Sequence, residues 1–382
     1  MKKIYLQITP FFPDKNSFRG PYVLDQVKAI QRNSNFEVKV IKIVNSLQEK
    51  YVYDDVEVYP LKVIDIPSSI LPGMFNKINY AKLKNLIFNQ MNLSINEIEI
   101  IHAHTVYPAG YLAVEFAKEF NKKVFIQHHG LDILQFDNGR ILKGILRNLN
   151  NSYKKKFFSK VIKQADLNIG VSKKVIDEVK KIADVKTYVL YNGVDKNKFY
   201  KIDNIQKENI FIIGCIGNFW PLKDQITLLR ALNLLVKEKN IKDIKVIFIG
   251  SGPTLKECQD FVKENQLESF VEFKKEIHHK YLNEFYNKLD LFVLPSYYEA
   301  LGCVYMEALQ VGIPIIAVKN QGIEEIIKEE KKYSLIEKKD YRQLAKNIEY
   351  FYKNRRRVNY DLDIDKFIRN FLNFIAEEQY ED

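Results

Sequence analysis

The chain has 382 residues and a formal net charge of +11, with 46% hydrophobic and 28% charged residues and no low-complexity segment. This length exceeds one ordinary core and predicts two domains of roughly 150–200 residues each. The three cysteines are far apart and form no C-x-x-C pair. Their spacing argues against a disulfide framework or a cysteine metal site and favours a reducing compartment.

Short β-rich runs alternate along the chain with segments of helical period, which is typical of α/β domains with parallel sheets. The strands expected in the first half are residues 2–9, 36–43, 98–104, 123–129, 166–172 and 187–194. Helical patterns lie between several of them, at residues 22–33 and 109–120. No window approaches the roughly 18 apolar residues that span a bilayer. We therefore expect a soluble, cytoplasmic protein.

The pattern begins again after a polar, aperiodic segment at residues 195–207. The strands expected in the second half are residues 209–217, 244–252, 269–275, 290–296 and 313–318. The helices expected there are residues 224–239, 255–266 and 282–289. Residues 363–382 form an amphipathic helix with an acidic tip. The pattern predicts two doubly wound domains, with ligands at the carboxyl ends of the strands.

Lysine supplies most of the positive charge, and three interpretations of it are open. The first is that the lysine runs are solvated helix faces. The second is contact with anionic membrane phospholipid, near which each basic residue gains about 1 kcal/mol. The third is nucleic acid, which we place last because no nucleic-acid-binding module accompanies the charge.

A strand, a turn and a helix follow one another in "PSYYEALGCVYMEALQVGIPII", residues 295–316. Backbone N–H groups at about residues 301–304 would form an anion site, and Gly302 allows close approach of a phosphate. Glu307 lies about 6 Å further along the helix, within reach of a ribose diol when a diphosphate occupies the N-terminus. Glu299 would face the group that the diphosphate carries. The alternative is a solvent-exposed helix with two ordinary glutamates.

Together with the segment that follows it, "AVKNQGIEEII", this stretch resembles the signature of the retaining nucleotide-sugar glycosyltransferases of family 4, which have the GT-B fold. The positions that match the signature are Pro295, Ser296, Glu299, Gly302, Glu307, Ala308, Gly312, Pro314, Gly322, Glu325 and Ile326. "IGNFWPLKDQITLLRAL" resembles the family's diphosphate-binding βα unit, with Lys223 on the lysine position. Asn218 falls where the family usually has arginine, so it offers a hydrogen bond but no charge.

The first half carries further segments of the same resemblance. "RGPYVLDQVKAI" resembles the family's N-terminal glycine loop, in which Gly20 would bring backbone N–H groups near the β-phosphate. "QHHGLDI" resembles the H-G-x-D segment, which places His129 near the C6 hydroxyl of the donor sugar and Asp132 beside it. "HAHTVYPAG" resembles the family's H-x-H segment, for whose His104 we favour a core or supporting role.

A zinc site is the alternative for the two close histidine pairs, His102 with His104 and His128 with His129. Residues two apart on a strand face the same side, whereas adjacent residues face opposite sides. Four histidines would therefore converge poorly on one metal, and we expect no metal site.

The resemblance implies a set of site residues. The expected catalytic residues are Glu299, His129 and Asp132. The expected nucleotide-sugar-binding residues are Gly20, Asn218, Lys223, Leu301, Gly302, Cys303, Val304 and Glu307.

It also implies two Rossmann-like domains facing each other across a cleft. Residues 1–198 would bind the acceptor, with the helix at 363–382 packing back on them, and residues 199–362 would bind the nucleotide sugar. The implied reaction moves a hexose, with retention, from a nucleoside-diphosphate sugar to an acceptor hydroxyl. It needs neither metal nor cofactor, and UDP-sugar is the favoured donor, before GDP-sugar.

The expected acceptor is a glycan or lipid-linked saccharide in the assembly of a bacterial-type surface polysaccharide or glycolipid. Residues 151–164, with five lysines beside Phe157 and Phe158, suit an interfacial helix on anionic lipid at the inner face of the cell membrane. They suit equally a lysine-coated helix that packs its phenylalanines inward. The apolar loop at residues 66–78 is a second candidate rim for acceptor or membrane.

Rival functions remain open. Other GT-B activities, a sugar-nucleotide epimerase or a phosphorylase, would be separated from transfer by incubation with donor and acceptor. A non-catalytic GT-B subunit that binds nucleotide sugar for a partner transferase is favoured by Arg19 and Asn218, where the family usually has glycine and arginine. Nucleic-acid binding is the weakest of these alternatives, and absent or salt-insensitive duplex affinity would eliminate it.

Overall fold

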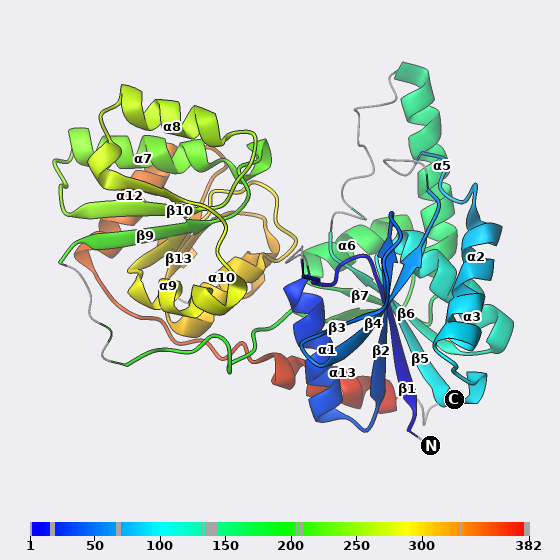
Figure 1. Ribbon diagram of the computed structural model, residues 1–382. Coiled ribbons are helices and arrows are strands. Elements are labelled where there is room, and N and C mark those ends of the chain that lie inside the picture. The colour runs from blue at the N-terminus through cyan, green and yellow to red at the C-terminus, as the bar shows by residue number, and fades with distance from the viewer. Residues whose placement is uncertain are drawn as a thin grey trace. The chain divides into compact units, whose positions relative to one another are not determined.

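The computed structural model describes residues 2–15, 20–65, 70–130, 133, 144–203, 205, 209–328 and 331–377. The chain folds into two compact units, residues 1–192 with 365–382, and residues 193–364. Each unit is an α/β domain, coloured blue to green with the red C-terminal helix in the first and green to orange in the second (Figure 1).

The first unit is built on an eight-stranded sheet with the order β3-β4-β2-β1-β5-β6-β7-β8. Its strands are β1 (Ile4–Thr9), β2 (Glu37–Val44), β3 (Tyr51–Tyr53), β4 (Val56–Lys62), β5 (Ile98–His104), β6 (Lys123–His128), β7 (Leu167–Gly170) and β8 (Thr187–Val189). All pairs are parallel except β3 with β4. In the central register, Ile8 pairs with Ile41 of β2 and with Ala103 of β5.

Helices cover both faces of this sheet. They are α1 (Pro21–Asn33), α2 (Asn76–Asn85), α3 (Tyr111–Phe120), α5 (Gly144–Lys163), α6 (Lys173–Ile182) and α13 (Ile364–Glu377). On one face α2 and α3 pack over a core that includes Ile101 and Ala103. On the other face Phe371 of α13 contacts the rings of His102 and Phe125. The C-terminal helix thus belongs to the first unit.

The second unit is built on a six-stranded parallel sheet with the order β11-β10-β9-β12-β13-β14. Its strands are β9 (Phe211–Ile216), β10 (Ile244–Ile249), β11 (Val271–Lys274), β12 (Leu291–Val293), β13 (Ile315–Val318) and β14 (Leu335–Ile336). Its helices are α7 (Gln225–Lys237), α8 (Leu255–Glu264), α9 (Leu282–Lys288), α10 (Cys303–Val311), α11 (Lys331–Ser334) and α12 (Tyr341–Lys353). This is the 3-2-1-4-5-6 order of a Rossmann domain, in which the strand order reverses between β9 and β12.

The first hairpin, β3 with β4, is absent from the sequence-based expectation. Asp54 and Asp55 form its turn with positive φ values of 49° and 63°, and aspartate tolerates this conformation better than most residues. Strand β3 is only three residues long, Tyr51-Val52-Tyr53, and it leaves Val52 exposed and buries neither tyrosine fully, so it lacks the buried apolar run that marks the other strands.

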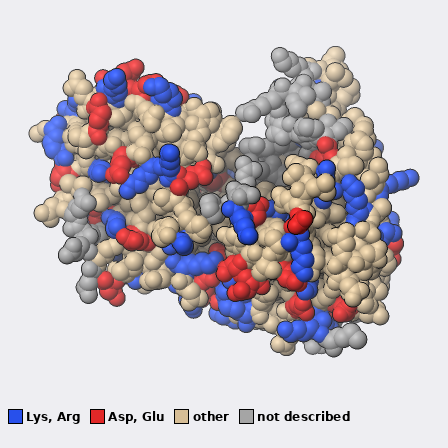
Figure 2. All heavy atoms as spheres, viewed as in Figure 1, with Lys and Arg blue, Asp and Glu red and all other residues tan. Residues whose placement is uncertain are grey.

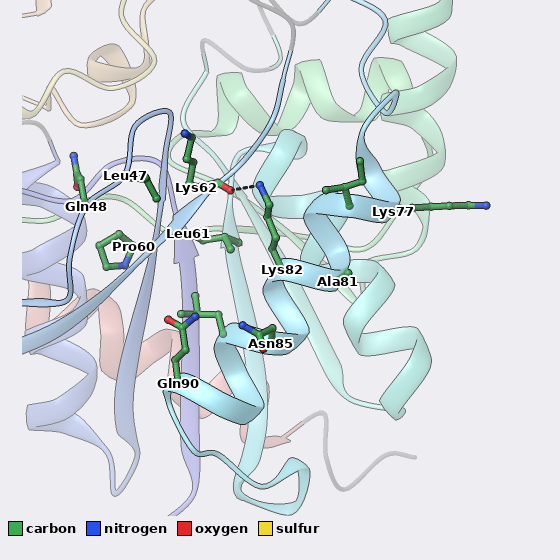
Figure 3. Close-up of a pocket in the computed structure, with 12 residues that line it drawn as sticks. Leu47, Gln48, Pro60, Leu61, Lys62, Lys77, Ala81, Lys82, Asn85 and Gln90 are labelled. Atoms are coloured by element: carbon green, nitrogen blue, oxygen red, sulfur yellow. Dashed lines mark hydrogen bonds between the residues drawn. The ribbon is translucent and has the colours of Figure 1, made fainter.

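Charged side chains of both signs are interspersed on the face seen in Figure 2, so the net positive charge is not gathered there in one area. None of the helices in the described ranges is long and apolar enough to cross a bilayer. A groove of about 730 Å³ lies between β4 and α2 of the first unit (Figure 3).

Candidate functional site

The strongest cluster of predicted site residues lies at the switch point of the second unit. Lys223 ends a short 3-10 turn after β9, Glu299 follows β12, and their side chains form an ion pair. Both side chains are largely buried, with 24% and 13% exposed. The loops are joined by backbone as well, because Tyr297 N donates to Leu222 O at 3.1 Å. The structure therefore brings a cation and an anion together where open α/β sheets bind ligands.

The helix predicted beside this pair is α10, and its N-cap is Gly302 with φ of +84°. A Cβ at Gly302 would lie 2.6 Å from the Tyr305 ring, so glycine is required by both conformation and space. Cys303 and Val304 belong to the first turn, whose N–H groups point towards the N-terminus of the helix. Leu301 was expected in that turn, but it precedes the cap and is buried at 1% exposure.

Glu307 lies inside the second unit rather than on a solvated helix face. Its side chain is 10% exposed, and His279 Nε2 lies 3.1 Å from one carboxylate oxygen. Tyr286 OH donates to the other oxygen at 2.8 Å. Burial, and then the Glu307 charge, raise the pKa of Tyr286 well above its ordinary value. The alternative of two ordinary exposed glutamates is wrong, since Glu299 is also mostly buried.

Asn218 lies on the loop after β9, at an exposed position of the same site. Its carbonyl accepts a hydrogen bond from Gln225 Nε2 at 3.1 Å. The backbone here is closely packed, because a Cβ at Gly250 would lie 2.3 Å from Gly217 O. Gly250 and Gly252 therefore hold this loop in place, because a side chain at either would collide with the backbone of residues 217–219.

Gln321 is a site residue that the motif analysis did not single out. Its Oε1 accepts from Glu299 N at 2.7 Å, and its Nε2 donates to Tyr297 O at 3.1 Å. Gly322 N also lies 3.4 Å from Glu299 O. Gln321 and Gly322 thus fix the turn that carries Glu299.

In the first unit, Gly20 and His129 are brought to the same place. Gly20 is the N-cap of α1 with φ of +87°, and a Cβ there would lie 2.5 Å from the Phe11 backbone. The Phe11 ring is 5.7 Å from the His129 ring, and the Tyr22 ring is 5.1 Å from it. These residues follow β1 and β6, at the carboxyl ends of the strands.

Three histidine rings form a stack behind this point. His102 and His104 have centroids 4.8 Å apart, and His104 and His129 have centroids 5.1 Å apart. Burial lowers the pKa of His102 to about 3 and lowers that of His104 well below its ordinary value. Tyr5 OH lies 2.7 Å from His102 Nδ1, which ties the inner end of the stack to β1.

The described part of the chain does not include every predicted site residue. Asp132 lies outside the described residues, as does Arg19. Within the described ranges, no group of three or more His, Cys, Asp or Glu side chains is placed to hold a metal ion.

Comparisons with known proteins agree with this geometry. Residues 196–370 match the family model of glycosyl transferases group 1, and residues 20–198 match that of glycosyltransferase family 4. An uncharacterized glycosyltransferase of Methanocaldococcus jannaschii is 29% identical over 67% of this chain and 64% of its own length. The N-acetyl-alpha-D-glucosaminyl L-malate synthase of Bacillus anthracis is 28% identical over 60% of this chain and 59% of its own. This chain therefore spans less than two thirds of either relative.

Solved structures share the fold at low identity. Sucrose-phosphate synthase from Thermosynechococcus elongatus superposes with a TM-score of 0.75 at 15% identity, over 100% of both chains. Anabaena HepE in complex with UDP superposes with a TM-score of 0.68 at 17% identity, again over 100% of both chains. Because the two family matches together span residues 20–370, the chain belongs to the group 1 glycosyltransferases of family 4, which have the GT-B fold.

Proposed function

We propose that the protein is a retaining hexosyltransferase that uses a nucleoside-diphosphate sugar as donor. The observation that carries the proposal is the Lys223–Glu299 ion pair beside the N-terminus of α10, at the switch point of the second unit. A diphosphate needs positive charge and N–H donors, and a departing sugar needs negative charge nearby. Both kinds of group lie at this one point.

In the proposed step, the bond between hexose C1 and the diphosphate oxygen breaks, and its electron pair stays on the diphosphate. The acceptor oxygen bonds to C1 on the same face, and its proton passes to the departing phosphate oxygen. Lys223 and the first-turn N–H groups of α10 would compensate the leaving-group charge. Glu299 would orient sugar hydroxyls and support the positive charge at C1, without acting as a nucleophile.

The other site residues have proposed roles that follow the family pattern. Glu307 would accept from the ribose diol, and Gly20 would bring N–H groups near the β-phosphate. His129 and Asp132 would contact the donor sugar. We propose that no metal and no cofactor take part, and activity that persists in EDTA would support this point.

UDP-sugar is the proposed donor, with GDP-sugar as the alternative. HepE of Anabaena was solved with UDP and with UDP-glucose. An Escherichia coli relative is named a UDP-Gal:alpha-D-GlcNAc-diphosphoundecaprenol alpha-1,3-galactosyltransferase, and a Mycolicibacterium smegmatis relative is named a GDP-mannose-dependent mannosyltransferase. These names describe those proteins, and they support both nucleotides for this family.

The proposed acceptor is a glycan or lipid-linked saccharide of a bacterial-type surface polysaccharide or glycolipid. One relative, 25% identical over 80% of this chain, is named the O-antigen chain mannosyltransferase RfbU of Salmonella typhimurium. Such acceptors place the proposed reaction in the cytoplasm, at the inner face of the cell membrane.

The test is a thermal-shift screen of UDP, GDP and ADP and their hexose conjugates, followed by transfer assays with the donor that stabilises most. A ligand that binds only the folded state raises stability by about 2.7 kcal/mol at one hundred times its dissociation constant. Stabilisation by a nucleotide sugar, with release of nucleoside diphosphate on addition of acceptor, is expected. NMR of the product would show the retained anomeric configuration, and an inverted product would overturn the mechanism.

A non-catalytic subunit that binds nucleotide sugar is the second candidate. Asn218 favours it, because this exposed position carries no charge where the family usually has arginine. Retained nucleotide-sugar binding, with neither donor hydrolysis nor transfer to any acceptor, would support this candidate over the enzyme.

A further inference from the structure

Exposed apolar side chains gather at one corner of the first unit, on α5 and around the start of α2. Most of the large hydrophobic side chains exposed in the described ranges belong to this unit. Those near α5 and the start of α2 are Leu71, Met74, Ile78, Ile145, Leu146, Leu149 and Tyr153. Ile145 is 78% exposed and Leu149 is 62% exposed, although both are in a regular helix. Water-exposed apolar clusters of this kind mark interaction surfaces.

The exposed apolar residues of α5 gather along one ridge of the helix. At 3.6 residues per turn, Ile145, Leu149 and Tyr153 lie nearly above one another, and Leu146 flanks them. The same ridge continues with Lys156, Lys160 and Lys163, all of which are exposed. Its character changes from apolar to cationic within roughly 10 Å along the axis, at 1.5 Å per residue. In Figure 1 the first half of α5 extends beyond the carboxyl ends of the strands.

The segment before α2 is joined to the middle of this ridge. Leu71 N donates to Asn150 Oδ1 at 3.0 Å, and Tyr153 OH donates to Pro72 O at 3.1 Å. These bonds hold Leu71 and Met74, which are 43% and 59% exposed, beside the apolar half of the ridge.

The two phenylalanines of α5 serve the core instead. Phe157 stacks on Tyr111 with centroids 5.6 Å apart, and Phe158 is 5% exposed. Lys154 is also buried. For Phe157 and Phe158, the expected inward packing is therefore correct, and the apolar contact surface lies two turns earlier in the helix.

The two segments that form this corner carry only positive charge, although Glu119 of α3 pairs with Lys84 of α2 nearby. The sequences 66–96 and 144–163 contain no aspartate or glutamate, while the second alone contains six lysines and arginines. The groove of Figure 3 borders the same corner at Ile78. Its lining includes the apolar Leu61 and Leu86 and the lysines Lys62, Lys77 and Lys82, and none of the lining residues is acidic.

We propose that the ridge of α5, with Leu71 and Met74, is a docking surface for an anionic phospholipid bilayer. The apolar half of the ridge would enter the interface, and the lysines would meet the phosphates of the headgroups. A second copy of the chain would place like charges opposite each other, so charge complementarity favours the bilayer. This proposal goes beyond the transfer reaction, and its test needs neither donor nor acceptor.

The test is sedimentation of the full chain with sucrose-loaded vesicles, either of phosphatidylcholine alone or of an equimolar mixture with phosphatidylglycerol. The protein is expected to sediment with the mixed vesicles and not with the neutral ones, and rising salt should release it. The double variant Ile145→Ser, Leu149→Ser should bind at least tenfold more weakly, by about 1.4 kcal/mol of lost burial. The triple variant Lys156→Gln, Lys160→Gln, Lys163→Gln should bind about tenfold more weakly or worse.

Two control variants remove the same kinds of side chain at other exposed positions. Val52→Ser with Tyr200→Ser removes two exposed apolar side chains, and Lys180→Gln with Lys256→Gln and Lys263→Gln removes the same charge. Both controls should sediment like the unsubstituted protein. Equal losses in controls and ridge variants, or no sedimentation with mixed vesicles, would overturn the proposal. A dimer by light scattering that Ile145→Ser, Leu149→Ser converts to a monomer would assign the ridge to a second copy instead.

Discussion

His104 Nδ1 lies 2.8 Å from His129 Nε2, while His104 Nε2 lies 3.3 Å from Gln7 Oε1. His104 is fully buried, and burial lowers its pKa well below the ordinary value, so the ring is neutral at physiological pH. A neutral ring that donates from Nε2 to Gln7 accepts at Nδ1. His129 then donates from Nε2, so one buried side chain fixes a proton on that nitrogen of a predicted substrate-contacting residue.

Substitution of His104 tests this relationship. Asparagine keeps an acceptor near the position of Nδ1, whereas phenylalanine keeps the ring and removes the acceptor. We expect His104→Phe to lower kcat by roughly 10- to 100-fold, because small misplacements at a reacting centre are costly, and His104→Asn to stay within a few-fold. UDP affinity, which we assign to the second unit, should change in neither. Equal losses in both variants would assign His104 to stability alone.

The buried histidines also predict how stability depends on pH. The pKa of His102 falls from an ordinary 6.5 to about 3, so the unfolded state binds more protons between these values. The contribution of each buried neutral histidine to the free energy of unfolding is complete above pH 6.5. It decreases as the pH falls, by up to about 1.4 kcal/mol per pH unit for each histidine. The pH dependence of denaturant unfolding measures this. His102→Phe should reduce the slope below pH 6.5 by about one proton, and an unchanged slope would contradict the buried neutral ring.

Glu299 provides the sharpest test of the proposed chemistry. Glu299→Ala removes the carboxylate that pairs with Lys223, and we expect transfer to be abolished while nucleotide binding is largely retained. Lys223→Ala should instead weaken nucleoside diphosphate binding, because it removes the cation. Thermal shift with UDP and steady-state transfer separate these outcomes. Turnover by Glu299→Ala at the unsubstituted rate would overturn the role assigned to this residue.

Much of the fold is readable from the sequence because buried parallel strands form continuous apolar runs. All six residues of β1 are buried, and the expected run at 2–9 contains it. Leu301 was expected among the first-turn N–H groups of α10 but precedes the Gly302 cap, since the positive φ of that cap is not visible in a residue pattern. The hairpin of β3 and β4 was missed because its first strand is half-exposed.

The supporting partners of the site could not be predicted for a different reason. His279 and Tyr286 reach Glu307 from a 3-10 turn and from α9, more than twenty positions earlier in the chain. Gln321 reaches the Glu299 turn from the segment after β13. Nothing in their local sequence indicates a role, because each contact is created by the packing of distant elements.

Glu307 allows ribose recognition to be separated from structural support. Glu307→Ala removes the carboxylate partner of Tyr286 OH, which keeps Val304 O at 3.2 Å as an acceptor, so we expect about 0.5–1.5 kcal/mol of lost stability. If Glu307 also contacts the ribose, UDP should bind the variant more weakly than the unsubstituted protein. The 2′,3′-dideoxy analogue of UDP, which lacks both ribose hydroxyls, should bind the two proteins about equally. Calorimetric titration of both ligands with both proteins provides the comparison. Equal losses of affinity for the two ligands would mean that Glu307 supports α9 and does not contact the ribose.

Asn218 stands where the family usually has the arginine that binds the diphosphate. Restoring a cation at this position tests how its absence affects nucleotide binding. Asn218 is exposed on the loop that also carries Lys223. Asn218→Arg should therefore tighten UDP binding several-fold at low salt, with a smaller gain at high salt, because a planar guanidinium pairs well with phosphate oxygens. Gln259→Arg, at an exposed position of α8, adds the same charge elsewhere and should leave UDP affinity unchanged. If Asn218→Arg weakens binding or leaves it unaltered, the diphosphate does not lie beside this loop.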